Sequence, residues 1–121
     1  MAAPQSSDVI VVGGGLAGMV TATRAAELGL RATVLERGVD TDYLCNSRIT
    51  SGVFHVASNN ILLDPAELRQ TLDKVTRGHC NPDLADALAG NARRAVEWLS
   101  RQGATFIKGP TPDRACFLLQ A

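Results

Sequence analysis

The chain has 121 residues, of which 45% are hydrophobic, so it can bury the core of one small globular domain. Its 12 basic residues balance its 12 acidic residues, and this zero net charge argues against binding to nucleic acid or to an acidic membrane surface. The three scattered cysteines, Cys45, Cys80 and Cys116, form no C-x-x-C pattern and indicate free thiols in a reducing compartment.

Residues 1–7 carry neither the positive charge nor the long apolar run of a secretory signal or a membrane anchor. We expect them to form a short disordered lead-in. The location that these features predict is the cytoplasm, with no membrane anchor.

Two apolar segments, residues 9–12 and 32–35, predict parallel β-strands. Between them, residues 16–28 are rich in alanine, and Gly29 follows at a position typical of a helix end. The order predicts a Rossmann-like βαβ unit in an α/β fold. A doubly wound parallel sheet needs more strands than these two, so we expect an incomplete sheet with an exposed apolar edge and poor solubility.

After this unit, the sequence predicts a largely helical segment. Residues 38–60 predict mostly loop, with a brief extended stretch at 53–57. Asp64-Pro65 and Asn81-Pro82 each place an N-cap residue before a first-turn proline, which predicts helix starts. The second of these helices is expected to end near Gly103, with an apolar stripe of Leu84, Leu88, Ala92, Ala95, Val96 and Leu99.

Beyond that helix, residues 105–107 predict a short strand. Gly109, Pro110 and Pro112 then predict irregular structure up to the C-terminus, because proline cannot continue a helix and interrupts strand pairing.

The turn between the first strand and the first helix carries the G-x-G-x-x-G pattern of dinucleotide sites in Gly13, Gly14, Gly15, Leu16, Ala17 and Gly18. In this pattern Gly13 permits a tight turn, Gly15 lets a pyrophosphate approach the backbone, and Gly18 lets the helix pack closely on the strand. The backbone N–H groups around Leu16 and Ala17 would then face the anion at the helix N-terminus.

Glu36 ends the second strand, about twenty residues beyond the loop, where a carboxylate can accept hydrogen bonds from the ribose of an adenosine. Arg37, next in the chain, is included in the expected cofactor site. Both FAD and NAD present an adenosine pyrophosphate to such a loop, so these residues do not distinguish FAD from NAD. A NAD-binding dehydrogenase module therefore stays an alternative, as does a truncated, inactive fragment that only binds nucleotide or a partner.

The segment from Asp8 to Glu36 resembles the FAD-binding N-terminus of flavoproteins. The segment from Asn46 to Gly52 is similar to a loop of the fumarate reductase and succinate dehydrogenase flavoprotein family, in which a hydroxyl residue, here Ser47, precedes a glycine by five positions. Residues 80–106 resemble the helix before that family's substrate-capping domain. Leu44 and Cys45 depart from the pattern, because many members have a glycine pair there.

This resemblance implies an FAD-dependent oxidoreductase that moves hydride between the flavin and a C–C bond of a small substrate. It places Ala17 at the pyrophosphate, Glu36 at the ribose, and Asn46, Ser47 and Gly52 along the inner part of FAD. Members with covalent flavin carry a histidine at the position of Asn46, so the FAD is expected to be non-covalent. Residues 8–121 would form the N-terminal part of an FAD-binding domain, with the cap and the catalytic acid and base outside them.

Other side chains predict less. His55, His79, Cys45 and Cys80 show no spacing of metal ligands, so no metal site is expected and both histidines are assigned structural or surface roles. Arg48, beside the expected flavin loop, could stabilise a reduced anionic flavin or orient a carboxylate substrate, or it could simply be solvated.

Overall fold

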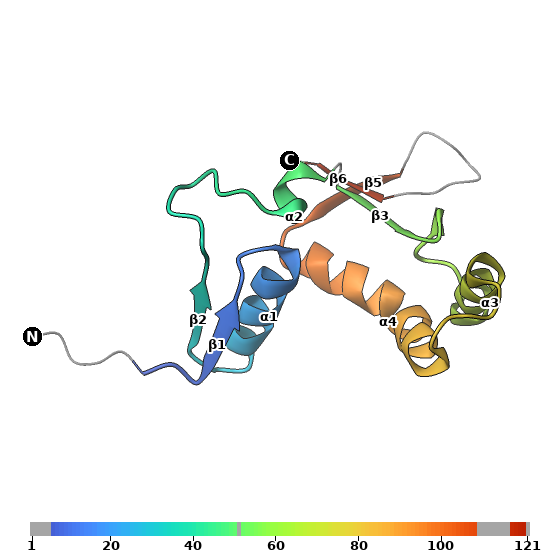
Figure 1. Ribbon diagram of the computed structural model, residues 1–121, viewed down its shortest axis with the longest axis horizontal. Coiled ribbons are helices and arrows are strands. Elements are labelled where there is room, and N and C mark those ends of the chain that lie inside the picture. Colours follow the sequence, from blue (N-terminus) through green and yellow to red (C-terminus); the bar gives the residue numbers. More distant parts are fainter. Residues whose placement is uncertain (1–5, 51, 109–116, 121) are drawn as a thin grey trace, which may run out of the picture. The chain divides into compact units, whose positions relative to one another are not determined.

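The computed structural model describes residues 6–50, 52–108 and 117–120. The chain forms two compact units, residues 1–50 and residues 51–121. Each unit has its own sheet (Figure 1).

The first unit is the predicted βαβ arrangement. β1 (Val9–Val12) and β2 (Ala32–Leu35) are parallel, with Val9 opposite Ala32 at the start of the pairing. α1 (Leu16–Glu27) connects the two strands and packs against both of them (Figure 1). Both strands and the helix therefore lie where the sequence predicts them, and the helix ends one residue earlier.

The end of α1 explains the glycine that follows it. Gly29 has a φ of +78°, a left-handed conformation that glycine adopts at little cost. Its N–H donates to the carbonyl of Ala26 at 2.9 Å, and the N–H of Leu30 donates to that of Ala25 at 3.0 Å. These two bonds form a Schellman motif, which reverses the chain toward β2.

Only one face of the parallel pair is well covered. Val11 is buried, and its side chain faces α1. Because side chains alternate along a strand, Ile10 and Val12 face the other way, and Val12 is 85% exposed. Leu35 of β2 is also exposed. The uninterrupted apolar run of β1 therefore leaves a hydrophobic surface opposite α1.

The loop predicted over residues 38–60 contains a one-turn helix, α2 (Asn46–Ile49), so the prediction is wrong there. The turn is closed by the N–H of Arg48, which donates to the carbonyl of Cys45 at 3.0 Å. A single turn is too short to show the apolar periodicity by which helices are recognised in a sequence.

The second unit begins with a β-hairpin. β3 (Val53–Val56) lies where an extended segment is predicted, and β4 (Asn59–Asn60) lies where a loop is predicted. Ala57 and Ser58 connect them with φ values of 48° and 65°, as in the tight two-residue turns of hairpins. Nδ1 of His55 accepts a hydrogen bond from the N–H of Ser58 at 2.9 Å, which gives this histidine a structural role.

β5 (Thr105–Lys108) confirms the strand predicted after the second long helix. The prediction of irregular structure beyond it is wrong for β6 (Phe117–Gln120), which lies between β3 and β5 in an antiparallel sheet of order β4-β3-β6-β5. One partner of β6 is far away in the sequence, so no local pattern reveals this pairing. The predicted breakers Gly109, Pro110 and Pro112 lie outside the described residues.

Both long helices of the second unit begin where their caps predict. α3 (Pro65–Thr76) follows Asp64 and α4 (Pro82–Arg101) follows Asn81. Each cap side chain accepts a hydrogen bond from a backbone N–H in the first turn, at 2.9 Å for Asp64 and 3.1 Å for Asn81. These bonds satisfy donors that have no partner inside the helix.

An arginine joins the two helices. Arg69 of α3 pairs with Asp73 one turn later, and its Nε donates to Oδ1 of Asp86 on α4 at 2.7 Å. The Cys80 thiol donates to Asp73 at 3.4 Å. The Arg69 guanidinium lowers the pKa of Asp73, with the thiol as a second cause. The group fixes α3 beside α4.

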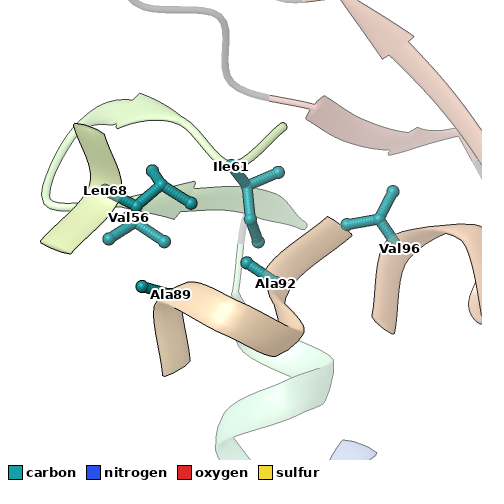
Figure 2. Close-up of a cluster of buried hydrophobic side chains, with 6 residues drawn as sticks. All are labelled: Val56, Ile61, Leu68, Ala89, Ala92 and Val96. Carbon is teal, nitrogen blue, oxygen red and sulfur yellow. The ribbon is translucent and has the colours of Figure 1, made fainter. Parts of the chain in front are cut away.

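The core of the second unit lies among α3, α4 and the hairpin (Figure 2). Phe54 and Phe106 pack against it and meet edge to face, with ring centroids 5.4 Å apart. The buried side chains of this core are Val56, Ile61, Leu68, Ala89, Ala92 and Val96.

The apolar stripe predicted for α4 is wrong at Leu84, Leu88 and Ala95. Leu84 and Leu88 are 70% and 48% exposed, whereas the alanines that follow them, Ala85 and Ala89, are buried. Ala95 is exposed as well. Leucines and alanines recur here with the same helical spacing, so periodicity alone cannot choose between the two faces. Alanine lets the helix backbone approach its neighbours, and tertiary packing selects that face.

Replacement of Leu68 by alanine is expected to lower the free energy of unfolding by about 2–5 kcal/mol, because it leaves a cavity around a fully buried position. Leu84→Ala is the matched control, and its cost should stay within about 0.5 kcal/mol because that side chain is exposed. Urea denaturation followed by far-UV circular dichroism measures both. Equal losses would mean that α4 packs through the leucine face.

Candidate functional site

The glycine-rich turn between β1 and α1 is anchored to the end of β2. The N–H of Gly13 donates to the carbonyl of Leu35 at 2.7 Å. Gly13 has a φ of +101°, a conformation in which any residue with a side chain is strained. This backbone geometry explains the glycine at the first position of the pattern.

Gly18 lets α1 lie against this turn. A Cβ at Gly18 would be 2.0 Å from the carbonyl oxygen of Gly13 and 3.3 Å from Cγ1 of Val11. Only glycine fits such an approach without a backbone shift. The contact corresponds to the packing role that the sequence predicts for this residue.

Glu36 bridges two backbone segments. Its Oε2 accepts a hydrogen bond from the N–H of Gly14 at 2.7 Å, and its Oε1 accepts one from the N–H of Gly38 at 2.9 Å. The bond from Gly14, and then that from Gly38, lowers the pKa of this carboxyl. Glu36 is therefore charged at neutral pH, and each carboxylate oxygen keeps a further lone pair for a hydroxyl donor.

The start of α1 presents backbone donors. The N–H of Leu16 donates to Oγ of Ser47 at 2.9 Å. Ala17 and Gly18 precede the first donor within the helix, Met19, and among the described residues their N–H groups meet no protein acceptor. Such amides at the positive end of a helix dipole suit an anion. This donor set fits the phosphates of a nucleotide cofactor.

The remaining predicted site residues are distributed over both units. Ser47 lies at the start of α1 although 31 residues separate it from Leu16, and Asn46 precedes it as the first residue of α2. Gly52 belongs to the second unit, directly before β3, with a φ of +69°. The first unit thus unites the glycine-rich turn, Glu36 and Ser47.

A hollow of about 300 Å³ is lined in part by Glu36. Such a volume can hold a small organic group. Arg37, a predicted site residue, takes part in its lining, which consists of Glu36, Arg37, Gly38, Val39, Asp40, Asp42, Tyr43 and Leu44.

Sequence reasoning missed Tyr43 and Gly38. The Tyr43 hydroxyl donates to the carbonyl of Gly14 at 2.6 Å. A Cβ at Gly38 would be 2.0 Å from Cβ of Tyr43, so a glycine is needed for the tyrosine to reach this place. The only available signal was that the single tyrosine of the chain stands in a polar loop.

Arg48 is engaged within its own loop. Its guanidinium donates to the carbonyl of Thr41 at 2.7 Å and pairs with Asp42 at 3.3 Å. It also lies 5.1 Å from the centroid of the Tyr43 ring, within the range of a cation–π interaction. These contacts occupy the cation for which the sequence suggests a flavin or substrate role.

The described residues contain no group of three or more side chains that could hold a metal ion. His79 is exposed at the end of the α3 region. No helix in the described part of the chain has both the length and the apolar character to cross a membrane.

Comparison with known proteins identifies one family. The family model described as FAD binding domain matches residues 8–115, nearly the whole chain. No curated protein and no solved structure matches. The matched range includes the glycine-rich turn, Glu36 and Ser47, and it decides for FAD against the nicotinamide alternative.

Gly18→Ala is expected to lower the free energy of unfolding by about 1–3 kcal/mol, because the added methyl group overlaps the Gly13 carbonyl. Gly90→Ala is the matched control, since Gly90 lies inside α4 with nothing near its missing Cβ. That change should instead stabilise the chain by about 0.5–1 kcal/mol. Thermal unfolding of both variants tests the contact, and a stabilised Gly18→Ala would refute it.

The charge of Glu36 should stabilise the fold only above a certain pH. Because the folded state lowers the pKa of this carboxyl, its contribution is complete above the ordinary value of 4.5 and disappears as the pH falls through the folded-state value. Glu36→Gln should therefore be less stable than wild type at pH 7, with the gap narrowing below about pH 4.5. The difference in stability between the two proteins is measured by urea denaturation at a series of pH values from 7 to below 4.5. A gap that is independent of pH would contradict the two backbone hydrogen bonds.

Proposed function

The chain belongs to the FAD binding domain family, and we propose that it is the FAD-binding part of a flavoprotein oxidoreductase resembling fumarate reductase and succinate dehydrogenase. One observation carries this proposal. In the first unit, free backbone N–H groups at the start of α1 lie near the ionised carboxylate of Glu36, which follows β2. FAD would supply a two-electron carrier for hydride.

The backbone at the start of α1 is proposed to bind the pyrophosphate. The N–H groups of Ala17 and Gly18 are free donors among the described residues, and Gly15 has no side chain to block the approach. The helix dipole favours an anion there by roughly 0.3–1 kcal/mol. Leu16 and Gly14 complete the turn and have partners of their own in Ser47 and Glu36.

Glu36 is proposed to hold the ribose of the adenosine. Its two bonds to backbone N–H groups fix the carboxylate in place, and its remaining lone pairs can accept hydrogen bonds from the ribose hydroxyls. The adjoining hollow, lined in part by Arg37, provides space for the adenosine. A carboxylate in this place also disfavours a cofactor with a phosphate on that ribose.

Asn46, Ser47 and Gly52 are proposed to lie along the inner, flavin-bearing part of FAD. The hydrogen bond between Ser47 and Leu16 supports this for the hydroxyl, because it brings Ser47 next to the glycine-rich turn. A non-covalent cofactor follows from Asn46, since an amide side chain cannot form the covalent flavin bond that a histidine forms in relatives.

The parallel pair β1–β2 is proposed to belong to a doubly wound sheet. The exposed apolar side chains of Ile10, Val12 and Leu35 support this, because such sheets carry helices on both faces. A cytoplasmic location is also part of the proposal. It is supported by Cys45 and Cys80, which are free thiols in the described structure.

The reaction proposed is hydride transfer between the flavin and a C–C bond of a small substrate. The described residues offer a binding site for the cofactor, and no residue among them is assigned as the catalytic acid or base. Arg48 is not assigned to substrate, because its charge is paired within the loop.

Glu36→Arg is expected to weaken FAD binding at least roughly tenfold, because it replaces an acceptor by a donor at the ribose. Glu67→Arg, the same change at an exposed position of α3, should leave the affinity unchanged. Quenching of flavin fluorescence during titration measures both dissociation constants. Equal affinities in wild type and Glu36→Arg would remove Glu36 from the site.

The proposed oxidoreductase activity is tested by the reoxidation of reduced flavin. The FAD-loaded chain is reduced chemically, and its reoxidation by unsaturated dicarboxylic acids is followed by the return of flavin absorbance. Reoxidation faster than that of free reduced FAD supports an enzyme. FAD binding without any such reaction would support cofactor binding alone, because the catalytic acid and base are expected outside these residues.

A further inference from the structure

The peptide groups of Gly14 are held from two sides by side chains. Its N–H donates to Glu36 at 2.7 Å, and its carbonyl accepts from the Tyr43 hydroxyl at 2.6 Å. A Cβ at Gly14 would lie 3.0 Å from the Tyr43 oxygen and 3.2 Å from Oε2 of Glu36, so both partners approach the backbone closely. Glycine at this position thus makes room for two polar side chains.

The bond from Tyr43 also determines where the next donor points. In a trans peptide the carbonyl of one residue and the N–H of the following residue point in opposite directions, and the described chain has no cis peptide. With the Gly14 carbonyl directed at Tyr43, the N–H of Gly15 is directed away from Tyr43. Among the described residues this N–H meets no protein acceptor. It adds a third free donor to those of Ala17 and Gly18.

The position of the hydroxyl is set by the packing of the tyrosine ring. The backbone of Gly38 lies close to the base of the tyrosine side chain, since a Cβ on Gly38 would overlap Cβ of Tyr43. Arg48 lies over the ring at 5.1 Å and is itself held by Asp42 and by the carbonyl of Thr41. The ring therefore carries its hydroxyl to Gly14 from a braced loop.

We propose that Tyr43 is a positioning residue for the cofactor site, whose hydroxyl orients the Gly14–Gly15 peptide so that the N–H of Gly15 joins the pyrophosphate donors. This inference rests on the proposed function, because it takes the start of α1 as the place of the FAD phosphates. It assigns the tyrosine to phosphate recognition and leaves the ribose to Glu36.

Tyr43→Phe tests the assignment, because it removes the hydroxyl and keeps the ring against Gly38 and Arg48. In the full chain, FAD and ADP should each bind roughly three- to tenfold more weakly, the effect of one hydrogen bond. Adenosine, which has no phosphate, should bind as it does to wild type. FAD is measured by fluorescence titration, and ADP and adenosine by their competition with FAD.

Two comparison variants make the pattern specific. Ser7→Ala removes a hydroxyl that is 2.5 Å from the hydroxyl of Thr33, and it should change none of the three affinities. Glu36→Gln should weaken adenosine, ADP and FAD together, because it acts on the ribose. If Tyr43→Phe does not fold, Arg48→Gln replaces it, since loss of the brace should weaken FAD and ADP in the same selective way.

Unchanged FAD affinity in Tyr43→Phe would overturn the inference while the proposed function stands. Equal weakening of adenosine and ADP would also overturn it, because the hydroxyl would then support the whole loop and not the phosphate donors. A wild-type chain that binds neither FAD nor ADP would refute the proposed function itself, and the inference with it.

Discussion

The hydrogen bonds of the Glu36 carboxylate are the constraint on which the candidate site depends. One oxygen holds the N–H of Gly14 in the glycine-rich turn, and the other holds the N–H of Gly38 in the loop after β2. These two segments are brought together at the carboxyl end of the parallel pair, which is where α/β sheets bind ligands. Because both donors favour the ionised form, the same contacts keep a negative acceptor at that edge.

Around this carboxylate the site is made mainly of backbone. Glycines permit the turn and the close approach of α1, and the donors for an anion are N–H groups at the helix start. Side chains from the following loop then support the backbone, with Ser47 on Leu16 and Tyr43 on Gly14. An arrangement of this kind binds what all dinucleotides share, so it specifies a nucleotide and leaves the substrate open.

The two units differ in how far their apolar surface is covered. In the second unit α3, α4 and the hairpin enclose a core around Leu68, whereas the β1–β2 pair of the first unit leaves Ile10 and Val12 exposed opposite α1. An apolar sheet face normally requires a second layer. This physical requirement supports the proposal that a further layer covers the face of the pair opposite α1.

Local chemistry in the sequence was sufficient for β1, α1 and β2 and for the caps of α3 and α4, because these elements rest on intrinsic backbone preferences and on contacts between near neighbours. The pairing of the glycine-rich turn with Glu36 spans 22 residues, and the sequence indicated it only through the known spacing of the dinucleotide motif. Tertiary structure alone decided that α4 buries its alanines, since two faces shared one periodicity, and that β6 enters a sheet with the distant β3. It also brought Tyr43 to Gly14 across 29 residues. Contacts between residues far apart in the chain leave no periodic trace in the sequence, so only the folded chain reveals them.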